Sequence, residues 1–325
     1  MPLLEVKGLT KYYDLSGDPL SRMFRGTKLL KAVDHINFSI NEGETFGLVG
    51  ESGCGKSTTA RLITRLIQAT EGEVIFQDRN ILSLPRKQIR EVRRNIQMVF
   101  QDPFASLNPR MRVGTIILEP LVTNEKISGA EAKRRVLQLL EVVGLPDRAA
   151  DLFPHEFSGG QRQRIAIARA LALSPKLVVL DEPVSALDVS IRAQILNLLR
   201  DLQAQLGLSY LFIAHDLAAV AHMSHTIAVM YLGKIVETGD ADTIAKTPKH
   251  PYTQALFSAA LPTHPDEQRE EIILPGEVPS PIRPPSGCRF HPRCPFAMAR
   301  CSEEEPQLLQ VDGRLTACHL YDAKP

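Results

Sequence analysis

The run GESGCGKST, residues Gly50–Thr58, decides the fold of this chain. It fits the pattern G-x-x-x-x-G-K-[ST], and it stands between the apolar stretch Thr45–Val49 and a helical pattern that includes Leu62 and Ile63. A strand, a glycine-rich loop and a helix in this order predict a phosphate-binding loop (P-loop) of an α/β protein. Its backbone N–H groups would turn inward around phosphates, and the start of the helix would add positive potential.

Two side chains of the P-loop would act on a nucleotide directly. Lys56 would reach the β- and γ-phosphates, and Ser57 would be a ligand of Mg²⁺. Taken alone, the run could be an ordinary glycine-rich turn, but the motifs that come later in the chain favour nucleotide binding. The residues predicted to hold the nucleotide here are Gly50, Ser52, Gly53, Cys54, Gly55, Lys56, Ser57 and Thr58.

Two acidic side chains follow a second predicted strand. Leu177–Leu180 is an unbroken apolar run, as expected of a parallel strand buried on both faces, and Asp181 and Glu182 come directly after it. Ligands of open α/β sheets bind at such carboxyl ends. We predict that Asp181 lies on the Mg²⁺ side and that Glu182 orients and deprotonates the attacking water. The alternative is a pair of solvated acids that opens a turn.

His215 follows a third apolar strand, Tyr210–Ala214. A lone histidine in such a place is more often structural. Its position after the two acids nevertheless favours contact with the γ-phosphate, so His215 is a candidate catalytic and nucleotide-binding residue.

The run FSGGQ, Phe157–Gln161, precedes another helical pattern. Ser158 fits the N-cap, and a helix start behind Gly159 and Gly160 exposes several N–H groups that suit an anion. The sequence alone leaves open whose phosphate would bind there, and the alternative is a capped helix without a ligand. The candidates are Ser158, Gly159, Gly160 and Gln161.

With these motifs in order, the chain resembles the ATP-binding-cassette (ABC) ATPases over roughly Leu3–Gly239. Phe157 stands where the signature of that family usually begins with Leu. The resemblance implies that Tyr13 stacks on adenine, with Tyr12 as the competing candidate. It also implies that Gln101, in VFQDP, contacts Mg²⁺ and the attacking water and senses the transport partner.

The resemblance further implies an assembly. Ser185–Asp188 is similar to the D-loop of the family, and two cassettes of the family meet head to tail. Residues Ser158–Gln161 of one cassette would then close on the ATP held by the P-loop of the other. A monomer would be catalytically incomplete.

Composition narrows the classes of partner. The chain has 325 residues, with 38 Lys and Arg against 37 Asp and Glu. This near-balance of charge gives no overall positive field that would indicate nucleic acid as the partner. The basic run from Arg86 to Arg94 is most simply a solvated helix face. No apolar stretch approaches the ~20 residues of a membrane span, and no signal peptide is apparent. We expect a cytosolic chain that docks on separate membrane subunits.

Changes in pattern along the chain predict its domains. A nucleotide-binding core of the P-loop NTPase (RecA-like) kind covers residues 1–83 and 174–239. A mainly helical signature subdomain covers 84–173, and an extension covers 240–325. The extension has seven prolines between Pro275 and Pro295, so we expect it to be irregular and extended there.

The extension also narrows the subfamily. His250-Pro251-Tyr252, the following TQALFSAALP and the later GEVPSPIRPPSGC resemble the C-terminal extension of ATPases that drive oligopeptide and dipeptide importers. The stretch DLSGDPLSRMFRGTKLLK, between Tyr13 and Ala32, resembles the second of two paired ATPase subunits in dipeptide systems. These peptides could instead be structural packing without information about the substrate.

Four of the five cysteines lie in the extension, at Cys288, Cys294, Cys301 and Cys318. A reducing cytosol disfavours disulfides, and structural zinc usually has a tighter first pair. Four thiolates on a loop-rich segment suit an iron–sulfur cluster, although the spacing matches no standard ferredoxin run. The resemblance implies a [4Fe-4S] cluster, with zinc or free thiols as alternatives. We expect Cys294→Ser to loosen the extension and to leave ATP binding at Lys56 largely intact.

The sequence as a whole predicts the ATP-hydrolysing subunit of a peptide importer at the cytoplasmic face of the inner membrane. Its expected partners are a second ATPase subunit, with a heterodimer favoured over a homodimer, two permease subunits and, indirectly, an extracytoplasmic peptide-binding protein. The same engine could serve nickel, glutathione or a sugar-linked peptide. A soluble ABC protein would need a second cassette, coiled coils or a basic surface, and a P-loop kinase would not use FSGGQ.

Overall fold

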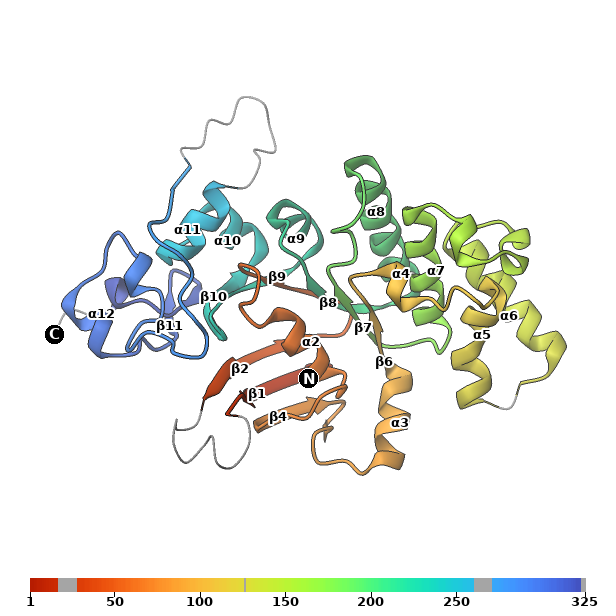
Figure 1. Ribbon diagram of the computed structural model, residues 1–325, viewed down its shortest axis with the longest axis horizontal. Helices are drawn as coiled ribbons and strands as arrows, with labels where there is room; N and C mark the ends of the chain where they lie inside the picture. Colours follow the sequence, from red (N-terminus) through yellow and green to blue (C-terminus); the bar gives the residue numbers. More distant parts are fainter. Residues whose placement is uncertain (17–27, 126, 260–270, 323–325) are drawn as a thin grey trace. The chain divides into compact units, whose positions relative to one another are not determined.

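The computed structural model describes residues 1–16, 28–125, 127–259 and 271–322 (Figure 1). Its contacts divide the chain into two compact units. Unit 1 consists of Met1–Ser39, Phe46–Leu82 and His215–Pro325, and unit 2 of Ile40–Thr45 and Ser83–Ala214. Much of the stretch that resembles the second ATPase of dipeptide systems, residues 17–27, lies outside the described residues.

Unit 1 contains strands of two sheets (Figure 1). One sheet has the order β2-β1-β4-β5, and β1 pairs antiparallel with β4. In the other sheet, β3 runs parallel to β9, β9 is antiparallel to β10, and the short strands β12 and β11 extend the sheet beyond β10. The strands are β1 (Leu4–Asp14), β2 (Leu29–Ile40), β3 (Thr45–Val49), β4 (Glu71–Phe76), β5 (Arg79–Asn80), β9 (Thr226–Tyr231), β10 (Lys234–Asp240), β11 (Leu309–Val311) and β12 (Arg314–Thr316).

In unit 1, helix α2 follows strand β3, which leads into the candidate site. β3 is buried along its whole length, and the P-loop connects it to α2. The C-terminal extension adds short helices and long irregular stretches, which agrees with its proline content. The helices are α2 (Lys56–Ile63), α9 (Leu217–Met223), α10 (Ala241–Lys246), α11 (Pro251–Ser258), η3 (His291–Arg293), α12 (Ala299–Glu303) and η4 (His319–Tyr321).

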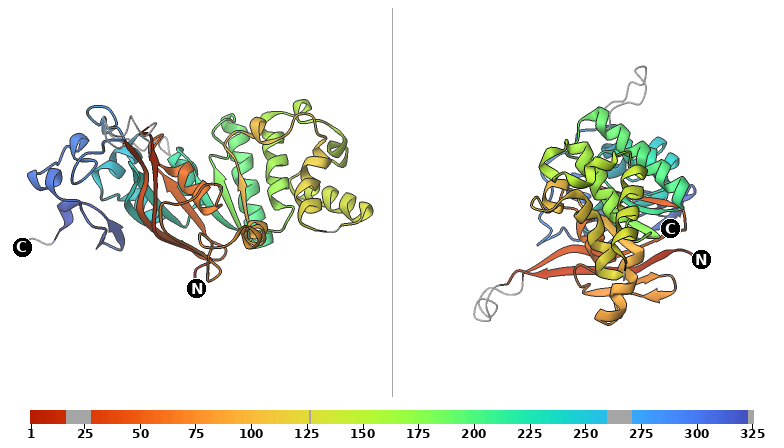
Figure 2. Two further views of the ribbon diagram at one scale, coloured as in Figure 1. Left: turned by 60° about the horizontal axis from the view of Figure 1, so that its bottom comes forward. Right: turned by 90° about the vertical axis from the view of Figure 1, so that its right-hand side faces the viewer.

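Unit 2 combines three parallel strands with a group of helices (Figure 2). The strands have the order β6-β7-β8, and β7 and β8 are buried at every residue, as the apolar runs predict. Helices α5, α6 and α7 pack against one another. The elements are α3 (Arg86–Asn95), β6 (Ile96–Val99), α4 (Pro103–Ser106), α5 (Val113–Asn124), α6 (Gly129–Val142), η1 (Asp147–Asp151), η2 (Pro154–Glu156), α7 (Gly159–Leu171), β7 (Leu177–Asp181), α8 (Val189–Leu206) and β8 (Ser209–Ile213).

Several predicted elements are confirmed and others need adjustment. The strand expected at Thr45–Val49 is β3, and the strand expected at Leu177–Leu180 is β7, which includes Asp181. The insert predicted to be mainly helical also contains strand β6. The two compact units are a division by contacts, in which β7 and β8 belong to unit 2. The domain boundaries drawn from the sequence stay a prediction.

Candidate nucleotide site

The P-loop needs glycine at two positions because neighbouring backbone lies close to it. Gly50 and Gly55 have φ angles of 150° and 116°. A Cβ atom at Gly50 would lie 2.1 Å from the carbonyl oxygen of Met230, and one at Gly55 would lie 2.2 Å from that of Ala32. This tight loop leads into the first turn of α2, and the backbone N–H groups at a helix start suit a phosphate.

Lys56 is buried, and its ammonium group lies inside the P-loop. Its Nζ donates to the carbonyl oxygens of Gly50 and Glu51, at 2.6 and 3.0 Å. Phosphate oxygens are acceptors of the same kind, so a bound nucleotide would replace these carbonyls as partners of the ammonium. Cys54 is buried beside it, and burial raises the pKa of its thiol, so Cys54 is a neutral packing group.

The two candidate adenine partners, Tyr12 and Tyr13, differ in the contacts of their side chains. Tyr12 Oη donates to Asp34 Oδ1 at 2.5 Å, and burial followed by this hydrogen bond raises the pKa of Tyr12. The contact shown by the Tyr13 ring is of another kind, since Lys11 Nζ lies 4.9 Å from its centroid. These contacts favour Tyr13 as the residue that stacks on adenine.

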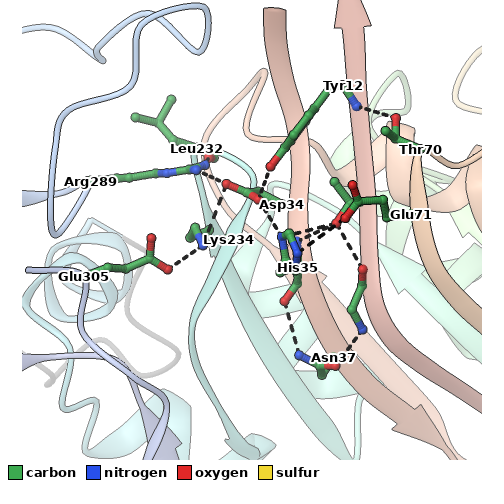
Figure 3. A network of polar contacts seen from close by, with 12 residues as sticks. Tyr12, Asp34, His35, Asn37, Thr70, Glu71, Leu232, Lys234, Arg289 and Glu305 are labelled. Carbon is green, nitrogen blue, oxygen red and sulfur yellow. Dashed lines mark hydrogen bonds and ion pairs between the residues drawn. The ribbon is translucent and has the colours of Figure 1, made fainter.

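Asp34 is the centre of the polar network in Figure 3. It accepts hydrogen bonds from Tyr12 and Arg289 and lies 2.9 Å from His35 Nδ1 and 3.7 Å from Lys234 Nζ. Burial alone would raise the pKa of Asp34, but these hydrogen bonds and positive charges outweigh it and hold the pKa below its usual range. Asp34 is therefore an anion that fixes Arg289 of the C-terminal extension to β2.

Unit 2 brings two predicted residues together at the carboxyl end of β7. Gln101 Nε2 donates to Glu182 Oε2 at 2.7 Å. Glu182 has a φ of 49°, which is uncommon for a residue with a side chain, and its N–H donates to the carbonyl oxygen of Ile213 at 2.8 Å. Asp181 precedes it and is 4 % exposed. Such backbone strain is a pointer to function when it occurs at a catalytic candidate.

The helix after FSGGQ begins as predicted. Ser158 is the N-cap of α7, and its Oγ accepts from the N–H of Gln161 at 3.3 Å. The Gln161 side chain accepts in return from the N–H of Ser158 at 3.0 Å, which completes a capping box. The contacts within unit 2 confirm the cap and leave the identity of an anion at this helix as a prediction.

The candidates divide between the two units. The P-loop, Tyr13 and His215 belong to unit 1, where His215 is exposed and precedes α9. Gln101, Ser158, Asp181 and Glu182 belong to unit 2. Sequence reasoning missed Glu51, Tyr252 and Arg293, which meet in unit 1, because they are separated by 201 and 242 residues along the chain.

The four cysteines of the extension have free thiols. Among the described residues, no three Cys, His, Asp or Glu side chains are arranged so that they could hold a metal ion. Burial, together with the charges of the neighbouring cysteines, raises the pKa of Cys288 to about 11 and that of Cys318 to about 12. Such thiols are neutral as they stand.

Backbone amides nevertheless donate to each of the four sulfurs. Met298 N lies 3.5 Å from Cys301 Sγ, and the other sulfurs accept from amides two or three residues further along the chain. Amide donors to sulfur stabilise thiolates and tune iron–sulfur clusters. The chemistry of the donor set therefore fits a metal–thiolate group, although the present arrangement is not a ligand set.

Comparisons with known proteins agree with the sequence motifs. Residues 33–185 match the ABC transporter family model, and residues 236–301 match the oligopeptide/dipeptide transporter C-terminal region. The chain is 51 % identical to the putative oligopeptide transport ATP-binding protein YkfD of Bacillus subtilis, with 99 % of this chain and 96 % of the relative aligned. It is 50 % identical to the dipeptide transport ATP-binding protein DppF of Haemophilus influenzae, with 99 % and 97 % aligned.

Solved structures support the same fold. The dimeric ATP-binding cassette MJ0796 in a post-hydrolysis state, bound to ADP and Pi, has a TM-score of 0.64 at 30 % identity, covering 73 % of this chain and 98 % of that one. The architecture and the motifs define an ABC-type ATPase cassette. The chain belongs to the ABC transporter family, as an ATP-hydrolysing subunit with the C-terminal region of oligopeptide and dipeptide transporters. Within the described ranges, its helices are too short or too polar to cross a lipid bilayer.

Proposed function

We propose that this chain hydrolyses ATP to drive the uptake of di- or oligopeptides through separate membrane subunits, as a peripheral subunit on the cytoplasmic face of the inner membrane. The C-terminal region carries the proposal. Residues 236–301 match a region described for oligopeptide and dipeptide transporters, and relatives aligned over nearly the whole chain are named for these solutes.

The chemistry is divided among residues of both units. Lys56 would exchange the carbonyls of Gly50 and Glu51 for phosphate oxygens, and His215 would contact the γ-phosphate. Ser57 and Asp181, with Gln101, would hold Mg²⁺, which supplies charge neutralisation when it is bound. Glu182 would accept the proton of the attacking water, and its hydrogen bond with Gln101 would orient the carboxylate.

Uptake into liposomes tests the proposed substrate. The chain is purified with the membrane proteins that accompany it and reconstituted with ATP on its own side. We expect a labelled dipeptide to accumulate only with hydrolysable ATP, and accumulation to stop with Glu182→Gln. ATP-dependent uptake of nickel or glutathione without uptake of peptides would contradict peptides as the substrate and leave the role in ATP-driven transport standing.

The proposed partner is a second ATPase subunit, and a heterodimer is favoured. Hydrolysis per chain should then rise with concentration or when the paired subunit is added. If the chain also pairs with itself, mixing Lys56→Ala with Ser158→Arg chains should restore one intact composite site. Full activity of a strictly monomeric preparation would contradict the head-to-tail assembly.

The proposal for the thiols is finer and rests on different observations. We propose that Cys288, Cys294, Cys301 and Cys318 hold a [4Fe-4S] cluster that ties down the proline-rich segment, with zinc as the alternative. The support is the family resemblance and the amide donors to each sulfur. Metal–thiolate binding would supply folding energy to a segment with few apolar side chains.

Metal analysis of protein purified without oxygen tests this point. We expect a brown protein with broad absorption near ~400 nm and about four irons per chain. About one zinc per chain without visible absorption would replace the cluster by zinc. A metal-free, colourless protein would leave four ordinary thiols.

A further inference from the structure

Arg293 lies in the segment Cys288–Cys318, called here the four-cysteine segment, and forms a bidentate ion pair with Glu51. Its Nη1 and Nη2 donate to the two carboxylate oxygens of Glu51, at 2.8 and 3.1 Å. The side chains are 8 % and 26 % exposed. The hydrogen bonds that Arg293 donates to Glu51 are the main cause that raises the pKa of Arg293, so this guanidinium stays charged. Paired donors on a planar carboxylate fix geometry as well as charge.

Glu51 is the second residue of the P-loop, and its backbone is held as well. Its N–H donates to Tyr252 Oη at 2.8 Å, and its carbonyl oxygen accepts from Lys56 Nζ at 3.0 Å. Two of the groups that fix Glu51, Arg293 and Tyr252, therefore come from the C-terminal extension, and another, Lys56, is the cation predicted to bind phosphate.

A packed aromatic cluster keeps these partners in place. The ring of Tyr252 lies 4.6 Å from that of Tyr231 and 5.4 Å from that of Phe290, and all three rings are almost fully buried. Tyr231 Oη also lies 3.5 Å from Arg293 Nη1. The extension thus contacts the P-loop beside a buried aromatic cluster of unit 1.

The charge of Glu51 makes this contact relevant to nucleotide binding. A P-loop must bind a polyphosphate, and the carboxylate of Glu51 places a negative charge in that loop. At a separation on the order of 10 Å, like charges near a protein surface repel enough to change affinity several-fold. Arg293 neutralises that charge through the ion pair.

We propose that Arg293 is a positioning residue of the nucleotide site, which neutralises Glu51 and fixes the P-loop conformation that Lys56 needs. The inference rests on the proposed nucleotide site. It makes the C-terminal extension part of the ATP-binding apparatus, rather than an appendage that only supports assembly.

The proposal also changes what is expected when the four-cysteine segment is disturbed. Arg293 lies between Cys288 and Cys294, and Arg289 ties the same segment to Asp34 and to the carbonyl oxygen of Leu232. Disorder in this segment would withdraw Arg293 from Glu51. We therefore replace the expectation that Cys294→Ser leaves ATP binding intact with the expectation that it weakens binding in the same direction as Arg293→Ala.

Equilibrium nucleotide binding to the full chain tests the proposal. Arg293→Ala should weaken binding of the Mg²⁺-bound β,γ-imido analogue of ATP about tenfold and that of MgADP about threefold, because the analogue carries more negative charge. Raising the ionic strength should shrink both losses. Arg293→Lys, which keeps the charge without the fork, should lose less.

A double variant separates charge neutralisation from simple anchoring of the extension. Glu51→Gln in the Arg293→Ala background removes the unpaired carboxylate and should recover most of the affinity, whereas Glu51→Gln alone should bind no more weakly than the double variant. Arg300→Ala removes an exposed ion pair with Glu304 and Asp322 in the same segment and should bind like wild type.

The outcomes are distinct. An Arg293→Ala chain that is folded by circular dichroism and binds both nucleotides like wild type would overturn the inference and leave the proposed function standing. An equal loss for both nucleotides that Glu51→Gln does not rescue would also overturn it, because it would show that Arg293 does not act by neutralising Glu51. Failure of the wild-type chain to bind either nucleotide would overturn both proposals.

Discussion

Glu51 is held both by a residue of its own P-loop, Lys56, and by residues of the C-terminal extension, and the two sets of partners differ in their distance along the chain. In the P-loop, the partners of Lys56 are five and six residues away, so one short run of sequence contains both the ammonium group and the carbonyls that hold it. The extension contacts Glu51 and Asp34 from 201 to 255 residues away. Interactions between residues close in sequence leave a recognisable motif, whereas interactions between distant residues become visible only in the folded chain. The two regions should therefore also respond differently to substitution.

The largest expected effect is on ATP hydrolysis, which depends on residues in the short sequence motifs rather than on the extension. Glu182→Gln removes the predicted base and should slow ATP hydrolysis by about 10²-fold or more while Mg-ATP still binds. It should also accumulate an ATP-bound dimer. Phosphate release by the assembled subunits measures the rate, with Glu141→Gln, on the exposed side of α6, as the control. Hydrolysis near the wild-type rate would remove Glu182 from its assigned role.

Lys56→Ala should act on nucleotide binding itself. The ammonium would contribute charge-assisted hydrogen bonds, each worth about 1.5–3 kcal/mol, so we expect roughly 10- to 100-fold weaker ATP binding. The thermal midpoint of the nucleotide-free chain serves as the control for folding. If the variant binds ATP normally but is unstable, Lys56 is a packing residue of the loop, and the contrast between motif and extension is lost.

Particular residues show how far the sequence reaches. The strand before the P-loop, the cap at Ser158 and the acidic end of β7 were predictable because apolar runs, caps and glycine patterns act over a few residues. The pairing of Gln101 with Glu182, 81 residues apart, needed the family resemblance to place both at one site. Arg293 gave no signal, since an arginine in a proline-rich segment looks like any solvated charge until Glu51 is found beside it.

The extension should show its different character in the pH dependence of stability. Burial lowers the pKa of His250 to about 3, while its ring caps α11 by accepting from the N–H of Tyr252. With an unfolded-state pKa of about 6.5, the unfolded chain binds the extra proton, so stability is complete above that pH and falls as pH drops. From pH 7 to pH 5 the loss from this group is about 2 kcal/mol.

His250→Asn keeps an N-cap acceptor and removes the titration. Denaturant unfolding at pH 7 and pH 5 should show a smaller fall in the free energy of unfolding for this variant than for wild type. The difference between the two chains matters because buried Glu237 has a raised pKa and acts in the opposite direction in both. An identical pH dependence of both chains would mean that His250 takes up its proton without unfolding the extension.

The smallest effect compares two serines of unit 2 that cap helices in the same way. Ser158 Oγ and Ser128 Oγ each accept from the N–H three residues on, both at 3.3 Å, at the starts of α7 and α6. Each change to Ala should lower the free energy of unfolding by about 1 kcal/mol. Only Ser158→Ala should also lower the ATPase rate of the assembled subunits, because only that helix start is proposed to face ATP on another cassette. Equal stability losses with equal, unimpaired rates would reduce FSGGQ to a helix cap. The P-loop and the two acids at the end of β7 would then be the functional sites that short sequence motifs predict.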